Sequence, residues 1–172
     1  RKILLDFDLS SSPANSVITS ARLSLYAFPA SLDGGHSSLS GSNACYIHEI
    51  SSPWTEASVT WNMQPTVYSS NPIVLTQSST EFDDYLDIDV TTIIQNKYSN
   101  PSASHGFMLS IINANYYRKM IFASSDHSDP NKRPKLEVTY TQPTNQAEVF
   151  EEAEFLLYPN PATNHIYIKT EF

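Results

Sequence analysis

The sequence is poor in residue types that several kinds of chemistry need. It has one cysteine, Cys45, and four glycines among 172 residues. A single cysteine excludes an intrachain disulfide, and the strand expected around Cys45 predicts a buried thiol rather than a reactive one. No HExxH, CxxC or G-x-S-x-G motif and no glycine-rich phosphate loop is present. We therefore expect that the protein is not an enzyme. Two catalytic arrangements stay as alternatives: a Ser-His-Asp triad, because serines are many, and a glycosidase pair of carboxylates among the aspartates of 83–89.

Positive charge is also scarce, with ten Lys and Arg against 18 Asp and Glu and a net charge of −8. A globally acidic protein is a poor general binder of nucleic acid or of an anionic membrane surface, so we expect neither partner. A polyanionic ligand would need a local basic patch. No apolar run approaches the roughly 20 residues of a membrane helix, which predicts that the chain does not span a membrane.

The overall composition is typical of an extracellular β protein. Ser, Thr, Asn and Tyr are abundant. The chain has no signal peptide, and it does not begin with methionine. We therefore interpret it as a mature or trimmed fragment.

Alternating apolar and polar residues predict short strands separated by turn signals. The strands are expected at 3–9, 17–28, 45–50, 71–76, 85–90, 106–112, 119–123 and 135–140. Residues 91–98 repeat apolar positions at helical spacing before Pro101, which predicts one short helix. This pattern predicts a two-sheet β-sandwich. The Ser- and Gly-rich segment 33–43 is expected to be a long surface loop without core residues, either mobile or functional.

Both tryptophans lie in the segment 54–65, between two prolines. Residues 58–61 alternate and are rich in β-branched and aromatic side chains, which predicts a short strand with Trp61 buried in the core. Trp54 opens a loop. Its side chain has two possible roles: it packs against the fold, or it is a platform on which a sugar stacks. Packing is favoured.

Three blocks of sequence, in this order, resemble one known family. The blocks are LLDFDLS and ITSARLSLY at 4–10 and 18–26, WTEASVTWNMQP at 54–65, and FASS and RPKLEVTY at 122–125 and 133–140. The pattern is similar to that of the DNRLRE-type domains, which are related to the family 96 carbohydrate-binding modules, and it covers residues 1–141. The resemblance implies an all-β fold, a jelly-roll-like β-sandwich of two antiparallel sheets.

The same resemblance implies a function. Such a domain is a non-catalytic polysaccharide-binding module, usually an accessory part of a secreted protein, and some related modules bind acidic polysaccharides such as alginate. The alternative is a structural or adhesive surface domain that acts as a spacer and has no sugar site.

The segment before the expected strand 119–123 combines aromatic and positively charged side chains. Tyr116 and Tyr117 precede Arg118 and Lys119. Aromatic faces suit the C–H surfaces of sugars, and an arginine offers a fork for carboxylate or sulfate groups. We predict that these four residues contact the ligand, with Trp54 as a further candidate. The alternative is an ordinary hairpin with solvated charges and tyrosine rings that lie on the sheet.

A structural calcium ion is the one cofactor that the sequence suggests. Asp126 and Asp129 lie in the loop SDHSDPN, and calcium is bound by several oxygen ligands, including carboxylates. We expect no required cofactor. A turn stabilised by the aspartate side chains is the alternative for this loop.

The character of the chain changes after Tyr140. Residues 142–154 contain Pro143 and four glutamates, which predicts an acidic linker between the module at 1–141 and a C-terminal segment at 155–172. That segment opens with a motif made of Tyr158, Pro159, Asn160, Pro161 and Ala162. The motif resembles the opening of the C-terminal sorting domains of the type IX secretion system of Bacteroidota, although the segment is shorter than such a domain.

This second resemblance implies a location and a partner. It implies export to the extracellular space or the outer cell surface through a transient contact with the type IX secretion machinery. A proline-punctuated turn between two strands is the alternative reading of the motif.

Overall fold

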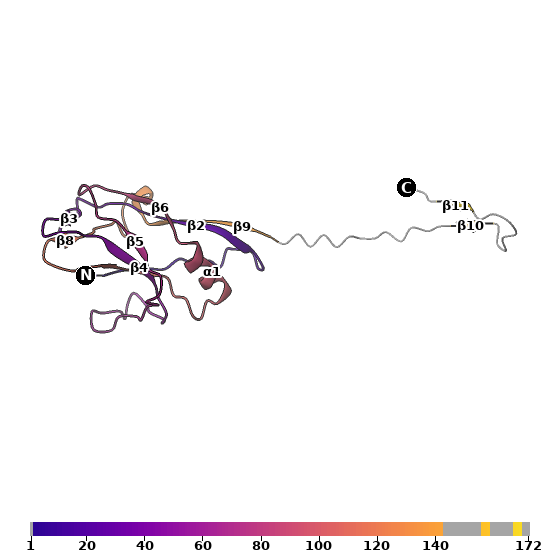
Figure 1. Cartoon of the computed structure of the whole chain (residues 1–172), viewed down its shortest axis with the longest axis horizontal. Helices are drawn as coiled ribbons and strands as arrows, with labels where there is room; N and C mark the ends of the chain where they lie inside the picture. The colour runs from indigo at the N-terminus through magenta and orange to yellow at the C-terminus, as the bar shows by residue number, and fades with distance from the viewer. Residues whose placement is uncertain (1, 143–155, 159–166, 170–172) are drawn as a thin grey trace. The chain divides into compact units, whose positions relative to one another are not determined.

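The computed structural model describes residues 2–142 and two further strands, 156–158 and 167–169. The chain divides into two units, Arg1–Gln142 and Pro143–Phe172. Short antiparallel strands and one α-helix make up most of the regular structure of the first unit (Figure 1). In the described part of the chain, no helix is long and apolar enough to cross a membrane.

A four-stranded antiparallel sheet forms one layer of the first unit. Its order is β1 (Lys2–Leu5), β7 (Phe107–Ile111), β4 (Cys45–Glu49) and β5 (Ile73–Leu75). Alternate residues of each strand point to the same side of a sheet, so Cys45 and Ile47 of β4 lie on one face together. Both are buried, and Ile47 pairs with the buried Leu109 of β7. This face is one half of the core.

A three-stranded antiparallel sheet supplies the other half. Its order is β6 (Tyr85–Asp89), β2 (Val17–Leu25) and β9 (Lys135–Thr141). The central strand β2 buries Ala21, Leu23 and Leu25, the alternate positions that the sequence predicts for the core. These residues belong to one hydrophobic cluster with Ile47 and Leu109 of the first sheet. The predicted β-sandwich of two antiparallel sheets is therefore confirmed.

The predicted short helix is confirmed as α1 (Thr91–Ser99). Ile93 and Ile94 are its buried residues, and both belong to the core. Asp89 precedes the helix, and its carboxylate accepts hydrogen bonds from the Thr91 hydroxyl at 2.7 Å and the Thr91 amide at 3.0 Å. The Thr91 hydrogen bonds, together with the nearby Arg22, lower the pKa of Asp89. This carboxylate therefore holds the first turn of α1 beside the end of β6.

Cys45 is buried, as the sequence predicts. Its sulfur lies 3.5 Å from that of Met120. Burial raises the pKa of the thiol to about 12, because the apolar surroundings disfavour the thiolate.

The expectation that 33–43 is a loop without core residues is wrong in part. His36 and Asn43 are buried, and β3 (Ser37–Ser38) pairs with β8 (Arg118–Lys119) at one end of the sandwich (Figure 1). The His36 Nδ1 accepts a hydrogen bond from the Ile121 amide at 2.9 Å, so Nε2 donates to the Asp83 carbonyl at 2.9 Å. The segment therefore packs through polar residues that have partners, which a search for apolar residues does not detect.

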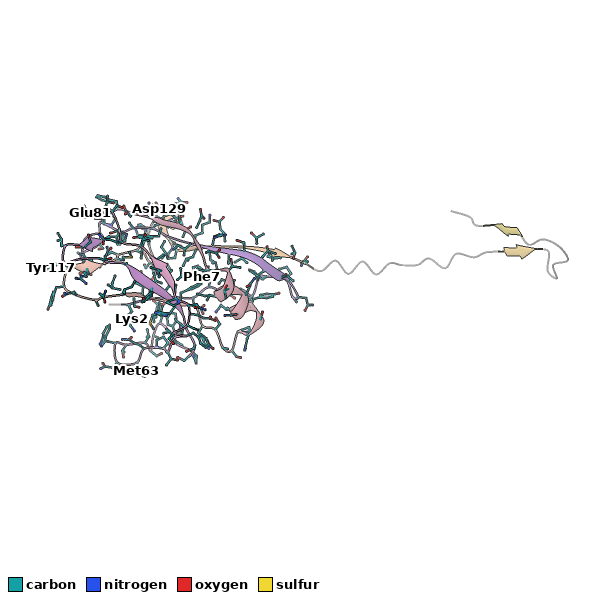
Figure 2. All side chains as sticks on the ribbon, in the orientation of Figure 1. Lys2, Phe7, Met63, Glu81, Tyr117 and Asp129 are labelled. Carbon is teal, nitrogen blue, oxygen red and sulfur yellow. The ribbon has the colours of Figure 1, made fainter. Side chains whose placement is uncertain are left out.

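The prediction of a strand at 58–61 with a buried Trp61 is wrong. The side chain of Trp61 is 68% exposed, and Thr60 and Met63 form a single bridge across a tight turn. The amides of Ser58 and Val59 both donate to the Thr55 carbonyl, which curls the chain before a strand can begin. Local hydrogen bonds therefore override a four-residue alternation, and the loop projects from the sandwich with Met63 near its tip (Figure 2).

The two tryptophans are expected to differ sharply in their effect on stability. Trp54 is partly buried, and its indole N–H donates to the His105 carbonyl at 2.9 Å. We expect Trp54→Ala to lower the free energy of unfolding by about 2–3 kcal/mol, because packing and a hydrogen bond are lost. Trp61→Ala should change it by less than about 0.5 kcal/mol. Urea denaturation followed by circular dichroism measures both, and a loss above about 2 kcal/mol for Trp61→Ala would contradict its exposed position.

In the second unit, β10 (Leu156–Tyr158) pairs antiparallel with β11 (Tyr167–Lys169). Tyr158 of the predicted sorting motif ends β10, whereas Pro159, Asn160, Pro161 and Ala162 lie outside the described residues. The predicted linker at 142–154 also lies outside them from residue 143 onward.

Candidate functional site

The predicted contact segment forms a turn that leads into β8. The Arg118 amide donates to the Asn115 carbonyl at 3.3 Å, and the Tyr116 amide donates to the Asn115 side chain at 2.7 Å. Tyr117 has φ +61°, a left-handed conformation that is uncommon for a residue other than glycine. Such a conformation costs free energy and persists only where the surrounding structure imposes it.

The neighbouring segment 37–40 imposes this conformation through two serines. The Ser37 hydroxyl donates to the Tyr117 carbonyl at 2.7 Å, and the Ser40 hydroxyl donates to the Tyr116 carbonyl. Both tyrosine carbonyls are therefore held by hydroxyls from a segment 76 to 80 positions earlier in the chain. The backbone beneath the two rings is fixed before any ligand arrives.

Arg118 adds a clamp between the same two segments. Its Nε donates to the Ser40 carbonyl at 2.8 Å, Nη2 donates to the same oxygen, and Nη1 donates to the Asn113 carbonyl at 3.0 Å. Gly41 makes room for this guanidinium, because a Cβ at that position would lie 2.5 Å from Nη2. The carbonyl groups satisfy donors without neutralising the positive charge.

Lys119 lies beside this turn and lines a shallow pocket. Its ammonium group donates to the Asp33 carbonyl. The pocket has a volume of about 490 Å³, and its wall also includes Tyr117, Leu39 and Glu81. Figure 2 shows Tyr117 and Glu81 at the end of the sandwich where β3 and β8 pair. The wall of this pocket therefore combines one positive and one negative side chain with Tyr117.

The two tyrosine rings are the most prominent feature of this end. The side chains of Tyr116 and Tyr117 are 83% and 68% exposed, and their ring centroids lie 6.2 Å apart with the ring planes tilted by 53°. Leu39, also exposed, lines the adjoining pocket. The result is a bent apolar surface with polar tips, which suits a ligand that has both apolar and hydroxyl faces.

Trp54 does not join this surface. It hydrogen-bonds to His105, next to the end of β7 that begins at Phe107, whereas the turn with Tyr116 follows the other end of β7. Trp54 therefore lies away from the tyrosine turn, and its contact with a ligand stays a prediction.

The loop with Asp126 and Asp129 forms a capped turn. The Asp129 carboxylate accepts from the Asn131 amide at 2.9 Å and from its side chain at 3.1 Å, and it caps the 3₁₀ helix η1 (Pro130–Lys132). Asp126 is exposed. Over the described residues, no group of three or more His, Cys, Asp or Glu side chains is arranged to hold a metal ion. This geometry is the turn that the sequence leaves as the alternative, and calcium binding stays a prediction.

Sequence reasoning missed the residues that hold the tyrosines in place. Ser37, Ser40 and Gly41 lie in the segment expected to be a long surface loop without core residues, and nothing in their own pattern points to a partner so far along the chain. The one available signal is the length of the loop, which is typical of either mobile or functional segments.

The architecture defines a class of protein: an antiparallel β-sandwich that presents exposed aromatic side chains at one end. Residues 1–140 match the sequence profile of carbohydrate-binding module family 96, and the chain belongs to that family. No curated protein matches the chain.

Proposed function

We propose that residues 1–141 form a non-catalytic module that binds polysaccharide, with Tyr116 and Tyr117 as the principal contact surface. The observation that carries this proposal is the exposure of both rings above a backbone held by Ser37 and Ser40. A backbone that is already held in one conformation loses less conformational entropy on binding, which favours affinity. Family membership supports a carbohydrate as the ligand.

An acidic polysaccharide fits this surface better than a neutral one. Arg118 and Lys119 place two positive charges beside the rings, in a protein whose net charge is −8. The guanidinium keeps its charge while it clamps the Ser40 and Asn113 carbonyls, so it attracts carboxylates at short range even though three of its nitrogens already have acceptors. Glu81, in the adjoining pocket, opposes this attraction.

Tyrosine variants test the contact surface. We expect Tyr116→Ala and Tyr117→Ala each to weaken polysaccharide binding about tenfold, because exposed aromatic anchors contribute a large share of binding energy. The melting temperature should change little, since neither ring is buried. Affinity gels and isothermal titration with a panel of acidic and neutral polysaccharides measure the effect. Tyr140→Ala, which removes an exposed aromatic ring on β9, is the matched control.

Two outcomes would count against this proposal. Unchanged binding by both tyrosine variants would place the site elsewhere, and absence of binding by the folded wild type across the panel would favour the spacer alternative. Arg118→Ala is not a clean probe of ligand contact, because it also removes the clamp between the two segments.

We also propose that the protein is exported by the type IX secretion system and acts outside the cell or on its outer surface. The motif at 158–162 and the acidic segment that precedes it support this location. Cell fractionation of the full-length protein, with and without the segment from Phe155 onward, tests the proposal. We expect the shortened protein to remain inside the cell, and a deletion of 143–154 is the matched control. Equal export of both forms would leave the motif as a turn.

A further inference from the structure

A cleft lies between α1 and the segment 68–73 that leads into β5. It has a volume of about 780 Å³, which is within the range of sites for small molecules. The Tyr68 amide donates to the Glu49 carbonyl at 3.0 Å, which places this segment at the Glu49 end of β4. Tyr116 follows β7, whose Ile111 pairs with Cys45 at the other end of β4. The cleft is therefore distinct from the tyrosine surface, and Figure 1 shows α1 well away from β3 and β8.

The wall of the cleft is rich in groups that recognise hydroxyls. Asn71, Thr92, Asn96 and Asn100 supply amide and hydroxyl groups from both sides. The ring of Tyr68 is 43% exposed, and its hydroxyl donates to the Ala103 carbonyl at 3.1 Å, which fixes the ring across the cleft. An anchored aromatic ring among several amides is an arrangement that can hold a sugar, with the ring against a C–H face and the amides on its hydroxyls.

Ser104 adds a second observation at this cleft. The residue belongs to the wall of the cleft and is only 1% exposed. Its hydroxyl is the one buried side-chain polar atom, among the described residues, to which no protein group hydrogen-bonds. A buried hydroxyl without a partner costs about 1–3 kcal/mol, so native proteins retain few of them without a reason. Rotation of this short side chain toward the cleft would give the hydroxyl a partner on a bound molecule.

The charge of the cleft selects among ligands. Glu49 and Asp89 belong to the wall, and no Lys, Arg or His is among its described residues. The Asp89 carboxylate is paired with Arg22 at 3.1 Å, which offsets its charge, so Glu49 supplies the negative charge of the cleft. The Glu49 carboxylate accepts from the Asn96 side chain at 2.9 Å and is thereby held in place. Carboxylates accept hydrogen bonds from sugar hydroxyls but repel uronate and sulfate groups. The cleft therefore favours a neutral ligand, in contrast to the surface beside Arg118 and Lys119.

We propose that this cleft is a second glycan site, which takes a neutral, hydroxyl-rich sugar chain. The choice of a sugar as the ligand class rests on the function proposed above, whereas the position and the charge preference rest on the cleft itself. Two sites of different charge preference at separate places would let one module bind an acidic and a neutral polysaccharide together.

Variants at left-handed positions provide a matched test. Asn71 has φ +52°, so Asn71→Gly removes the amide group while glycine keeps the backbone conformation. Asn15 has φ +62° and does not line the cleft, so Asn15→Gly is the control. Ser104→Ala is the second variant, and it should fold at least as well as the wild type because it removes a hydroxyl without a partner.

The probe is an array of neutral glucan, mannan, xylan and galactan oligosaccharides together with alginate oligosaccharides. We expect the wild type to bind at least one neutral glycan, and Asn71→Gly and Ser104→Ala each to weaken that binding about fivefold, with Asn15→Gly unchanged. Neutral binding that both cleft variants retain in full would overturn the proposal. If neutral binding were lost in Tyr116→Ala or Tyr117→Ala but kept in both cleft variants, the second site would be overturned and the polysaccharide-binding function would remain. A wild type that binds only alginate would overturn the second site, and one that binds no glycan would overturn both proposals.

Discussion

Replacement of Gly106 by alanine is expected to lower the free energy of unfolding by about 3–5 kcal/mol. Gly106 has φ +94°, and a Cβ there would lie 2.2 Å from the Leu5 carbonyl oxygen and 2.9 Å from an oxygen of Asp6. Its own carbonyl accepts from the Ile50 amide at 2.9 Å. The chain cannot relax away from Leu5 without disturbing the pairing of β1 with β7 or this hydrogen bond, so backbone strain and steric overlap add.

Gly34→Ala is the control for the backbone conformation alone. Gly34 has φ +72°, but the nearest atom to its added Cβ is the Lys119 ammonium nitrogen, at an ordinary contact distance of 3.6 Å. This variant should lose only the cost of a left-handed alanine, about 1–2 kcal/mol. Urea denaturation followed by circular dichroism measures both. Equal losses would show that the approach of Leu5 to Gly106 has no consequence for stability.

Leu23→Ala is expected to have an effect of similar size by another mechanism. Leu23 is fully buried in the centre of β2, where it pairs with Ile88 on one side and Leu136 on the other. Truncation removes the transfer free energy of the side chain and leaves a cavity between the two sheets. The expected loss is about 3–5 kcal/mol, the upper part of the range for such substitutions, because strands on both sides limit collapse.

Val17→Ala on the same strand is the matched control. Val17 is 59% exposed, so its truncation should cost less than about 1 kcal/mol. Differential scanning calorimetry at one pH compares the two. If Leu23→Ala melted within a degree of Val17→Ala, β2 would not be the central strand of the core.

Much of the sandwich could be predicted from the sequence because its strands have one buried face. The alternation of Ala21, Leu23 and Leu25 identifies the inward face of β2, and Ile93 and Ile94 identify that of α1. Trp61 could not be placed in the same way. Four alternating residues carry too little information to outweigh local hydrogen bonds, and the turn around Thr55 depends on the geometry of those bonds.

The candidate site could also be predicted only in part. The adjacency of aromatic and basic residues marks 116–119 as a candidate segment, but it predicts neither the exposure of the rings nor the role of Arg118. Its acceptor, the Ser40 carbonyl, lies 78 positions away and is a backbone atom, so the identity of the residue carries no signal. The sequence does not indicate the cleft beside α1 for the same reason, because Asn71 and Asn96 come to line one cleft only through the tertiary fold.

The shielded sulfur of Cys45 makes the module a convenient scaffold for site-directed conjugation. The only native thiol is buried and its pKa is raised to about 12, so it does not compete for maleimide reagents near neutral pH while the protein is folded. A cysteine introduced at exposed Thr141, at the end of β9, would then be the sole reactive position. A fluorophore or a solid support attached there would lie on a strand that lines neither the tyrosine pocket nor the cleft beside α1, which leaves both surfaces open to glycans.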